Sequence, residues 1–439
     1  MKPPYILIST IIPKKGMKIG DYDKHSKYLV KVVAPTDLSE TLFQYAENFY
    51  EAAHIITEFI LYAEHPDIAK LDTYFFAIAF LYRHCIEVGL KAIGFQYIQD
   101  EEERKKFVKN TCHNLYDILQ VIEKESNSIR PNEEVEWLRK YFEDLSQTDR
   151  ESDSFRYPFH VVWELDEWDL DGEFTIKRVF TEQTHIDLLK FANKFEAAYE
   201  IIKKWYLKET DGAVEWNGLE PVFIETGGDY YAQSVIGYQY RRQDFYPYAK
   251  AYLETANYLK WYMKNETNLG NGNCKNHLFL PMCYLYRNCV ELSLKTIWFE
   301  ETGEDFQIKC KLMLDKKHSI EGLWRKLKPY ILEYIKGTDE PEYIDVIEDY
   351  CIQVQKLDSD ANKFRYPMAN TMQVYFPQNK RFDFMHVGDF LEALNNILDG
   401  IDSEFNYINE IRAEMEAEYR AEMEAEYRAE MMAEQDYYW

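Results

Sequence analysis

Apolar and polar positions follow a helical period along most of the chain. Starting near residue 38, apolar side chains return every three or four positions, for example at Phe49, Ala53 and Ile56. This spacing places them on one face and predicts a long amphipathic helix. A second helix is predicted over about 70–98, where nearly every face is apolar and the helix should therefore be buried.

Two further helices complete this first unit. One is predicted to begin at His113, and the next covers about 132–146. The word FRYP at 155–158 then closes the unit. Proline ends it because its ring cannot continue a helix and restricts the residue before it.

The whole series occurs twice, which indicates a tandem duplication. FLYRHCIEVGLKAI at 80–93 aligns with YLYRNCVELSLKTI at 284–297, and FRYP returns at 364–367. The segments 42–53 and 113–119 likewise match 245–256 and 318–324. Four landmarks in one order, at nearly one separation, are the signature of a repeated domain. The second copy should repeat the helices near 245, over 276–301, from His318 and over 341–357.

Short strands are predicted around these helices. Residues 160–180 alternate apolar and polar side chains about Asp171-Gly172, which predicts a β-hairpin, and 371–385 gives a shorter one. β-rich segments lead into each copy, and a last helix closes each at about 184–208 and 387–411. The predicted fold is mainly α (α+β): two pseudo-symmetric four-to-five-helix bundles, each with a small β-hairpin, plus a C-terminal charged helix.

Three regions follow from this division. The first repeat covers 1–210, the second covers 211–411, and a polar, glycine-containing linker lies near 208–221. The tail, 412–439, repeats the unit RAEMEAEY. An eight-residue period drifts about 80° around an α-helix, so no straight apolar seam persists. Two interpretations of the tail remain: it is a solvated single helix, or it is a segment that binds a protein partner.

Composition limits the class of protein. The formal net charge of −26 favours solubility and repels nucleic acid at long range, so any RNA or nucleotide contact requires a local basic cleft. Scattered cysteines without ligand spacing predict reduced thiols and no metal site. No apolar run is long enough to span a membrane, and the N-terminus does not resemble a signal peptide. We therefore expect a cytoplasmic protein without a membrane contact and without a cofactor.

A charged stripe crosses the most apolar helix of each copy. Arg83, Glu87 and Lys91 are four residues apart and so share one face. The second copy repeats the stripe as Arg287, Glu291 and Lys295. Burying an unpaired charge costs several kcal/mol, so the stripe must face a partner group, a cleft or the solvent edge.

Two other polar residues belong to each predicted cluster. His113 and Arg156 join the first stripe, and His318 and Arg365 join the second. One interpretation is structural: a salt ladder, a helix-capping histidine, and FRYP as a corner in which Arg156 binds Asp149. The other is an anion site, because two arginines and a lysine outnumber one glutamate and would hold a phosphate group.

The pattern LYRxCxELxLKxI, followed by a histidine and by FRYP, resembles prokaryotic HEPN-like (higher eukaryotes and prokaryotes nucleotide-binding) helical proteins, over about 40–160 and 245–370. The resemblance implies a four-to-five-helix bundle that often dimerises, so a homodimer is also consistent with it. Many such proteins are metal-independent ribonucleases of toxin–antitoxin and phage-defence systems. Their catalytic word is a short motif: an arginine, often followed by a polar residue, then a short spacer and a histidine. The histidine acts as general base toward the ribose 2′-OH, and the arginine stabilises the charge of the phosphorane.

This chain begins that word twice, with Arg83-His84 and Arg287-Asn288, but no histidine follows at the family's spacing. His113 and His318 would have to supply the base through space. The candidate catalytic residues are Arg83, His113, Arg156, Arg287, His318 and Arg365. The candidate binding residues are His84, Glu87, Lys91, Asn288, Glu291 and Lys295.

Two functions therefore remain open. The first is a metal-independent endoribonuclease of a prokaryotic defence or stress system, acting on RNA at a cleft between the repeats. The second is a catalytically inactive HEPN-like module that binds a nucleotide, RNA or a protein partner.

Overall fold

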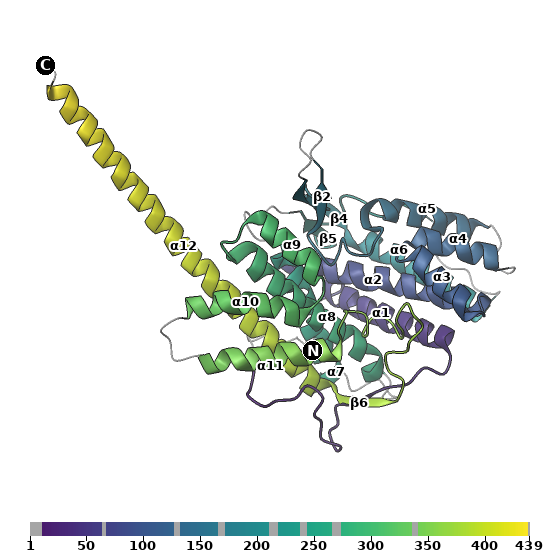
Figure 1. The fold of residues 1–439 in the computed structure, drawn as a ribbon. Helices are drawn as coiled ribbons and strands as arrows, with labels where there is room; N and C mark the ends of the chain where they lie inside the picture. Colours follow the sequence, from purple (N-terminus) through teal and green to yellow (C-terminus); the bar gives the residue numbers. More distant parts are fainter. Residues whose placement is uncertain are drawn as a thin grey trace.

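Two helical halves lie against each other, and a long C-terminal helix extends away from both (Figure 1). The computed structural model describes residues 11–63, 67–126, 132–165, 172–209, 218–237, 244–265, 274–335 and 341–437. Within these ranges it contains twelve α-helices, one π-helix and six short strands, which confirms the mainly α (α+β) class. None of the described helices combines the length and the apolar character needed to cross a bilayer.

The helices of the two halves follow one another in the same order. Those of the first half are α1 (Leu38–Leu61), α2 (Ile68–Tyr97), α3 (Glu101–Thr111), α4 (Leu115–Glu125), α5 (Glu133–Asp149) and α6 (Leu188–Leu207). Those of the second half are α7 (Tyr246–Asn265), α8 (Cys274–Thr296), the π-helix η1 (Ile297–Glu301), α9 (Phe306–Lys316), α10 (Ile320–Tyr334), α11 (Pro341–Leu357) and α12 (Phe384–Tyr437).

Each half has one short helix more than the pattern predicted. The predicted four or five helices per copy become six because α3 and α9 occupy stretches that the sequence left unassigned. Both begin at an aspartate cap: the side chain of Asp100 accepts a hydrogen bond from the backbone N–H of Glu103, and that of Asp305 accepts one from Gln307. The aspartates were the sequence signal that could have predicted α3 and α9, since an aspartate at the N-cap accepts a hydrogen bond from a free N–H of the first turn.

The two candidate histidines precede their helices and do not open them. The α4 helix is capped by Asn114, whose side-chain oxygen accepts from the backbone N–H of Tyr116 at 3.0 Å. Ser319 does the same for α10 by accepting from Gly322 at 3.1 Å. His113 and His318 therefore lie just outside the first turn, where their backbone carbonyls are free to accept bonds from another element.

The strands form three antiparallel pairs. The β2 strand (Phe159–Glu164) pairs with β3 (Glu173–Arg178), which confirms the first hairpin; Asp171 of its turn lies outside the described residues. The second predicted hairpin, over 371–385, is wrong. Its residues contribute an isolated bridge between Met368 and Val374 and the strand β6 (Lys380–Asp383), which pairs with a strand near the N-terminus.

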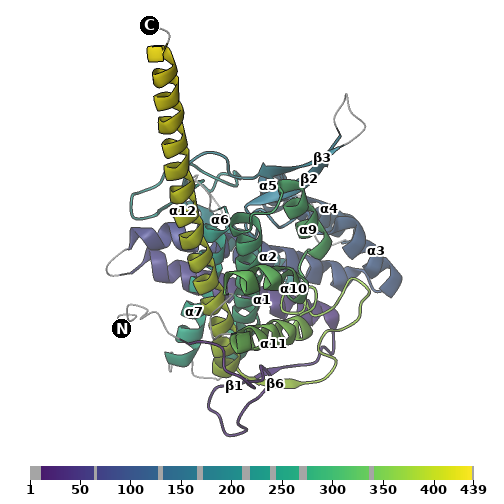
Figure 2. The same ribbon diagram turned by 60° about the vertical axis from the view of Figure 1, so that its left-hand side comes forward.

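The remaining strands are exchanged between the halves. The β1 strand (Leu29–Val32) leads into the first half but pairs with β6, at the end of the second (Figure 2). Conversely, β5 (Gln233–Ile236) leads into the second half and pairs with β4 (Thr184–Asp187) of the first. The two copies are thus interlocked. Most of the predicted linker, 210–217, lies outside the described residues.

One hydrophobic core runs through both halves. The α2 and α8 helices lie at its centre, with α1 packed on α8 and α2 packed on α7. Phe80 of α2 and the equivalent Tyr284 of α8 stack with their ring centres 4.8 Å apart. Phe49 and Tyr252 flank this pair at the same ring distance, 6.4 Å, from Phe80 and Tyr284 respectively. The pseudo-symmetry axis therefore passes through an aromatic contact between the copies.

Candidate functional site

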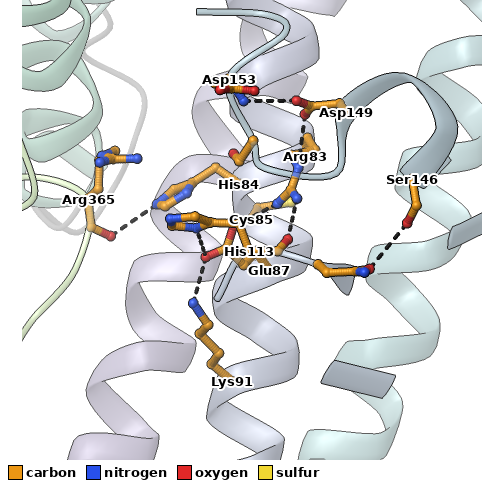
Figure 3. Close-up of polar contacts among 12 residues, drawn as sticks. Arg83, His84, Cys85, Glu87, Lys91, His113, Ser146, Asp149, Asp153 and Arg365 are labelled. Carbon is orange, nitrogen blue, oxygen red and sulfur yellow. Dashed lines mark hydrogen bonds and ion pairs between the residues drawn. The ribbon is translucent and has the colours of Figure 1, made fainter. Parts of the chain in front are cut away.

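The first charged stripe is fully buried in α2 and its arginine is satisfied on every side (Figure 3). The Arg83 guanidinium donates from Nη1 to Glu87 at 2.7 Å and from Nε to Asp149 of α5 at 3.1 Å. Its Nη2 donates to the backbone carbonyl of His113. The arginine thereby ties α2 to α5 and to the loop before α4, and none of its side-chain surface is exposed.

Glu87 is the centre of this cluster. Its Oε1 atom accepts from Lys91 at 2.7 Å, from Tyr366 at 2.6 Å, and lies 3.0 Å from Nδ1 of His113. Burial alone would raise the pKa of Glu87, but Lys91, His113 and Arg83 outweigh it and hold that pKa well below its ordinary value. Glu87 is therefore a carboxylate, and its charge binds the surrounding donors together.

The second cluster repeats this geometry around Glu291 of α8. Lys295 lies 2.8 Å from Glu291, and Nδ1 of His318 lies 3.0 Å from the same carboxylate oxygen. Arg287 donates to Glu291 and to the backbone carbonyl of His318, while its Nε lies 3.8 Å from Asp358. The two clusters are thus equivalent in structure as well as in sequence.

Each cluster is completed by a tyrosine from the opposite half. Tyr366, from the second FRYP word, donates to Glu87, and Tyr157, from the first, donates to Glu291 at 2.8 Å. The ammonium of Lys91 lies 5.2 Å from the ring centre of Tyr366, and that of Lys295 lies 4.4 Å from that of Tyr157. A carboxylate buried in each half thus holds the FRYP segment of the other.

This exchange corrects the predicted grouping of Arg156 with Arg83. One interpretation of the sequence has FRYP as a corner of its own bundle, with Arg156 binding Asp149. Instead Asp149 accepts from Arg83 and from the backbone N–H groups of Asp153 and Ser154. No pattern in the sequence indicated the exchange, because a repeated word matches either copy equally well.

The two FRYP arginines lie near the contact between the halves. Nε of Arg156 donates to the backbone carbonyl of Ser152 at 2.6 Å, and Nε of Arg365 donates to that of Ala361 at 2.7 Å. The guanidinium of Arg365 lies 5.4 Å from the ring centre of Tyr284. Both arginines are buried, and in each the Nη1 atom has no hydrogen-bond partner among the described residues. Figure 3 shows the Arg365 side chain directed away from Glu87.

His113 and His318 are ionisable members of the clusters that reach the surface. Their side chains are 32% and 35% exposed. Glu87 raises the pKa of His113, but burial, Lys91 and Arg365 outweigh it, so the pKa lies below its ordinary value. The pKa of His318 is lowered in the same way, against Glu291. Both rings are therefore neutral at pH 7. A proton on Nδ1 is favoured by the carboxylate, which leaves the lone pair on Nε2.

The two remaining candidates are inside the core. His84 has no exposed surface; its Nε2 lies 3.1 Å from the backbone oxygen of Arg365, and burial lowers its pKa well below the ordinary value. Asn288 is equally buried, and its side-chain oxygen is 3.5 Å from the Tyr284 hydroxyl. Both side chains are enclosed by protein rather than directed at a surface.

Two grooves of the described surface lie elsewhere. One of about 1060 Å³ runs between α9 and α10, and one of about 720 Å³ lies beside the start of α5. None of the twelve candidate residues lines either groove. Within the described ranges, no three His, Cys, Asp or Glu side chains are grouped as a metal site would require.

Comparison of the chain with protein-family models, with curated proteins and with solved structures found no match. The HEPN-like resemblance therefore stays a prediction, and the function must be argued from the geometry of the two clusters.

Proposed function

We propose that this protein is a catalytically inactive HEPN-like module of a prokaryotic defence or stress system, built as an intramolecular dimer that binds a partner. In this proposal the two polar clusters serve assembly: each joins three segments of its own half to the FRYP segment of the other. The resemblance supplies the family and the biological setting, and the clusters supply the argument against catalysis.

One observation carries the proposal: the arginines that begin the family's catalytic word are fully buried and are held by their own clusters. Arg83 and Arg287 have no exposed side-chain surface, and each is directed at its own glutamate, an aspartate and a backbone carbonyl. An arginine that stabilises a phosphorane must present donors where the charge develops. To do so here, Arg83 would have to leave Glu87 and Asp149, and breaking a buried ion pair costs about 3–5 kcal/mol.

The test is an RNA cleavage assay in EDTA with the full-length protein and two substrates, total RNA and tRNA. The proposal expects no difference between the wild-type protein and the double variant His113→Ala/His318→Ala, both indistinguishable from buffer. Cleavage by the wild type that is lost in the double variant would overturn it. Circular dichroism of the variant separates lost activity from lost folding.

A metal-independent ribonuclease is the second candidate, and the histidine geometry favours it. His113 and His318 are neutral, each is oriented by a glutamate through Nδ1, and each is partly exposed. This is the relation between a general base and the group that orients it. In this case the base would be Nε2, and positive charge would come from Arg365 or Arg156, which depress the pKa of His113 and of His318 respectively.

The two candidates differ in what Arg365 does. A ribonuclease should lose about 100-fold or more in rate in Arg365→Gln, since removing one stabilising donor typically costs that much. A binding module has no such rate to lose. Lys363→Gln, two residues away and half-buried, is the matched control because it removes a positive charge from the same segment. Its ammonium lies over the ring of Phe376, and its backbone N–H, which donates to Asp358, is unchanged in the variant.

A further inference from the structure

The tail portion of α12 sorts its side chains into four rows with a period of four residues. One row is alanine: Ala413, Ala417, Ala421 and Ala425. The next is glutamate: Glu414, Glu418, Glu422 and Glu426. The third is apolar: Met415, Tyr419, Met423 and Tyr427. The last alternates arginine and glutamate: Arg412, Glu416, Arg420, Glu424 and Arg428. Residues four apart lie along one ridge of an α-helix, so each chemical type has its own ridge.

The apolar ridge is exposed and continues upstream. Met415, Tyr419, Met423 and Tyr427 are 65%, 64%, 50% and 64% exposed. Tyr407 and Ile411 precede them at the same spacing and are also exposed. Figures 1 and 2 both show this part of α12 clear of the two halves. A straight seam is absent, as the eight-residue period predicts, but a ridge that winds about 40° per four residues is continuous.

The charges beside the ridge are unequal. On one side Arg420 lies 3.4 Å from Glu416 and Arg428 lies 3.5 Å from Glu424, so these charges largely cancel. On the other side, Glu414, Glu418, Glu422 and Glu426 have no ion-pair partner among the described residues. The apolar ridge is thus bordered along one side by uncompensated negative charge.

We propose that the Met/Tyr ridge and its glutamate border form a docking surface for a protein partner that presents an apolar pocket flanked by lysine or arginine. Charge complementarity selects this partner over a second copy of the chain, whose own net charge is −26 and whose tail carries the same glutamates. Methionine and tyrosine suit such a surface because one adapts its shape and the other anchors with little entropy loss.

The repeat makes the surface an array. Successive eight-residue units present the same Met, Tyr and Glu side chains about 12 Å apart along the axis and turned by about 80°. A straight partner helix would cross an i, i+4 ridge at roughly 50° and contact only a few of its residues. Each unit is therefore a separate docking element, and a partner with several pockets gains affinity from several units at once. This inference is independent of whether the two halves cleave RNA.

The test uses the full-length protein and a fluorescent Leu/Lys peptide that forms an amphipathic helix, with a scrambled peptide of identical composition beside it. Two tail variants are compared. One replaces Met415, Tyr419, Met423 and Tyr427 with Gln; the other replaces Ala413, Ala417, Ala421 and Ala425 with Gln. Glutamine keeps the helix propensity high in both, and circular dichroism checks that the tail remains helical.

We expect the amphipathic peptide to bind the wild type at least tenfold more tightly than the scrambled one. The Met/Tyr variant should remove that preference, the alanine-row variant should keep it, and replacing the four border glutamates with Gln should weaken both peptides. Equal binding of the two peptides, or equal loss in the two tail variants, would overturn the proposal. Sedimentation that finds a wild-type dimer lost in the Met/Tyr variant would assign the ridge to a second copy instead.

Discussion

The same charge pattern occurs in two opposite settings in this protein. In α2, Arg83, Glu87 and Lys91 alternate in sign every four residues at almost zero exposure. In the tail of α12, Glu416 and Arg420 repeat that spacing with side chains at least 70% exposed. The spacing specifies only that neighbours on a helix face will meet. Burial determines how much the resulting ion pair contributes to the stability of the fold.

The buried stripe recruits partners that the exposed row does not need. Glu87 gathers donors from α2, from the loop before α4 and from the FRYP segment of the other half. Among the described residues, the exposed Glu424 pairs only with Arg428, within the helix. A buried charge must be compensated from all sides, and so it determines how distant segments assemble. An exposed charge is compensated by water.

The largest expected effect is the loss of a buried carboxylate. Glu87→Gln should lower the free energy of unfolding by about 3–5 kcal/mol, because Lys91 keeps its burial but loses its counter-charge and Arg83 keeps only Asp149. Glu291→Gln should do the same in the second half. Urea denaturation followed by tryptophan fluorescence measures both losses.

The control for that measurement is Glu424→Gln, which removes the same charge from the same spacing in the tail. Its expected effect is within about 0.5 kcal/mol. A loss at Glu87 no larger than the loss at Glu424 would mean that burial does not separate the two settings, and the comparison would fail.

The next effect concerns the bond that crosses between the halves. Tyr366→Phe removes the hydroxyl that donates to Glu87 at 2.6 Å and should cost about 1.5–3 kcal/mol, the range for a hydrogen bond to a charged group. Tyr375→Phe is the matched control, since its hydroxyl donates to Asp360 at the surface at 3.0 Å and should cost less than about 1 kcal/mol. Equal losses of unfolding free energy in the two variants would indicate that the hydrogen bond from Tyr366 to Glu87 does not hold the two halves together.

Much of this arrangement followed from the sequence, and the exchange did not. The i, i+4 stripe in an apolar helix predicted that Arg83, Glu87 and Lys91 share one face and must meet a partner group, a cleft or the solvent edge; in the structure they are buried against partner groups. The duplication predicted that Arg287, Glu291 and Lys295 repeat them. Which copy supplies Tyr157 or Tyr366 was undetermined, because two copies of one word satisfy the same pattern in either pairing.

The strands show the same ambiguity in the backbone. By pattern alone, the β-rich segment that leads into the first copy could pair within its own copy or with the other copy. The structure selects the second, across the halves. The hydrophobic pattern fixes which face of a strand is buried; it does not fix which copy provides the neighbour. Duplicated chains are thus predictable in their elements and ambiguous in their connections.

A smaller effect should appear in the pH dependence of stability. The pKa values of His113 and His318 are lowered in the folded protein, so the unfolded chain takes up their protons first as the pH falls. Their contribution to stability is complete above the unfolded value, near 6.5, and is lost progressively below it. His54, His160 and His277, whose pKa values are raised by carboxylates, contribute with the opposite sign.

A double variant isolates the cluster histidines from the others. In His113→Gln/His318→Gln, unfolding free energy should fall less steeply between pH 6.5 and pH 5 than in the wild type, because the opposing histidines are common to both proteins. His185→Gln is the control, since this side chain lies on the exposed part of β4, away from both clusters. A steeper fall in the double variant would show that the cluster histidines are protonated in the folded state.

The smallest effect is expected for the exposed tail of α12. Ending the chain at Ile411 removes the whole repeated tail, and it should change the unfolding free energy of the two halves by less than about 0.5 kcal/mol, since exposed i, i+4 pairs stabilise only their own helix.

The contact most at risk is Arg412, whose guanidinium lies 4.9 Å from the ring centre of Tyr334. A second truncation that keeps Arg412 separates this contact from the repeats. If the shorter chain alone loses stability, the stacking of Arg412 on Tyr334 accounts for it. If both lose several kcal/mol, the tail packs on the halves in solution, and exposure cannot be what distinguishes its charges from those of α2.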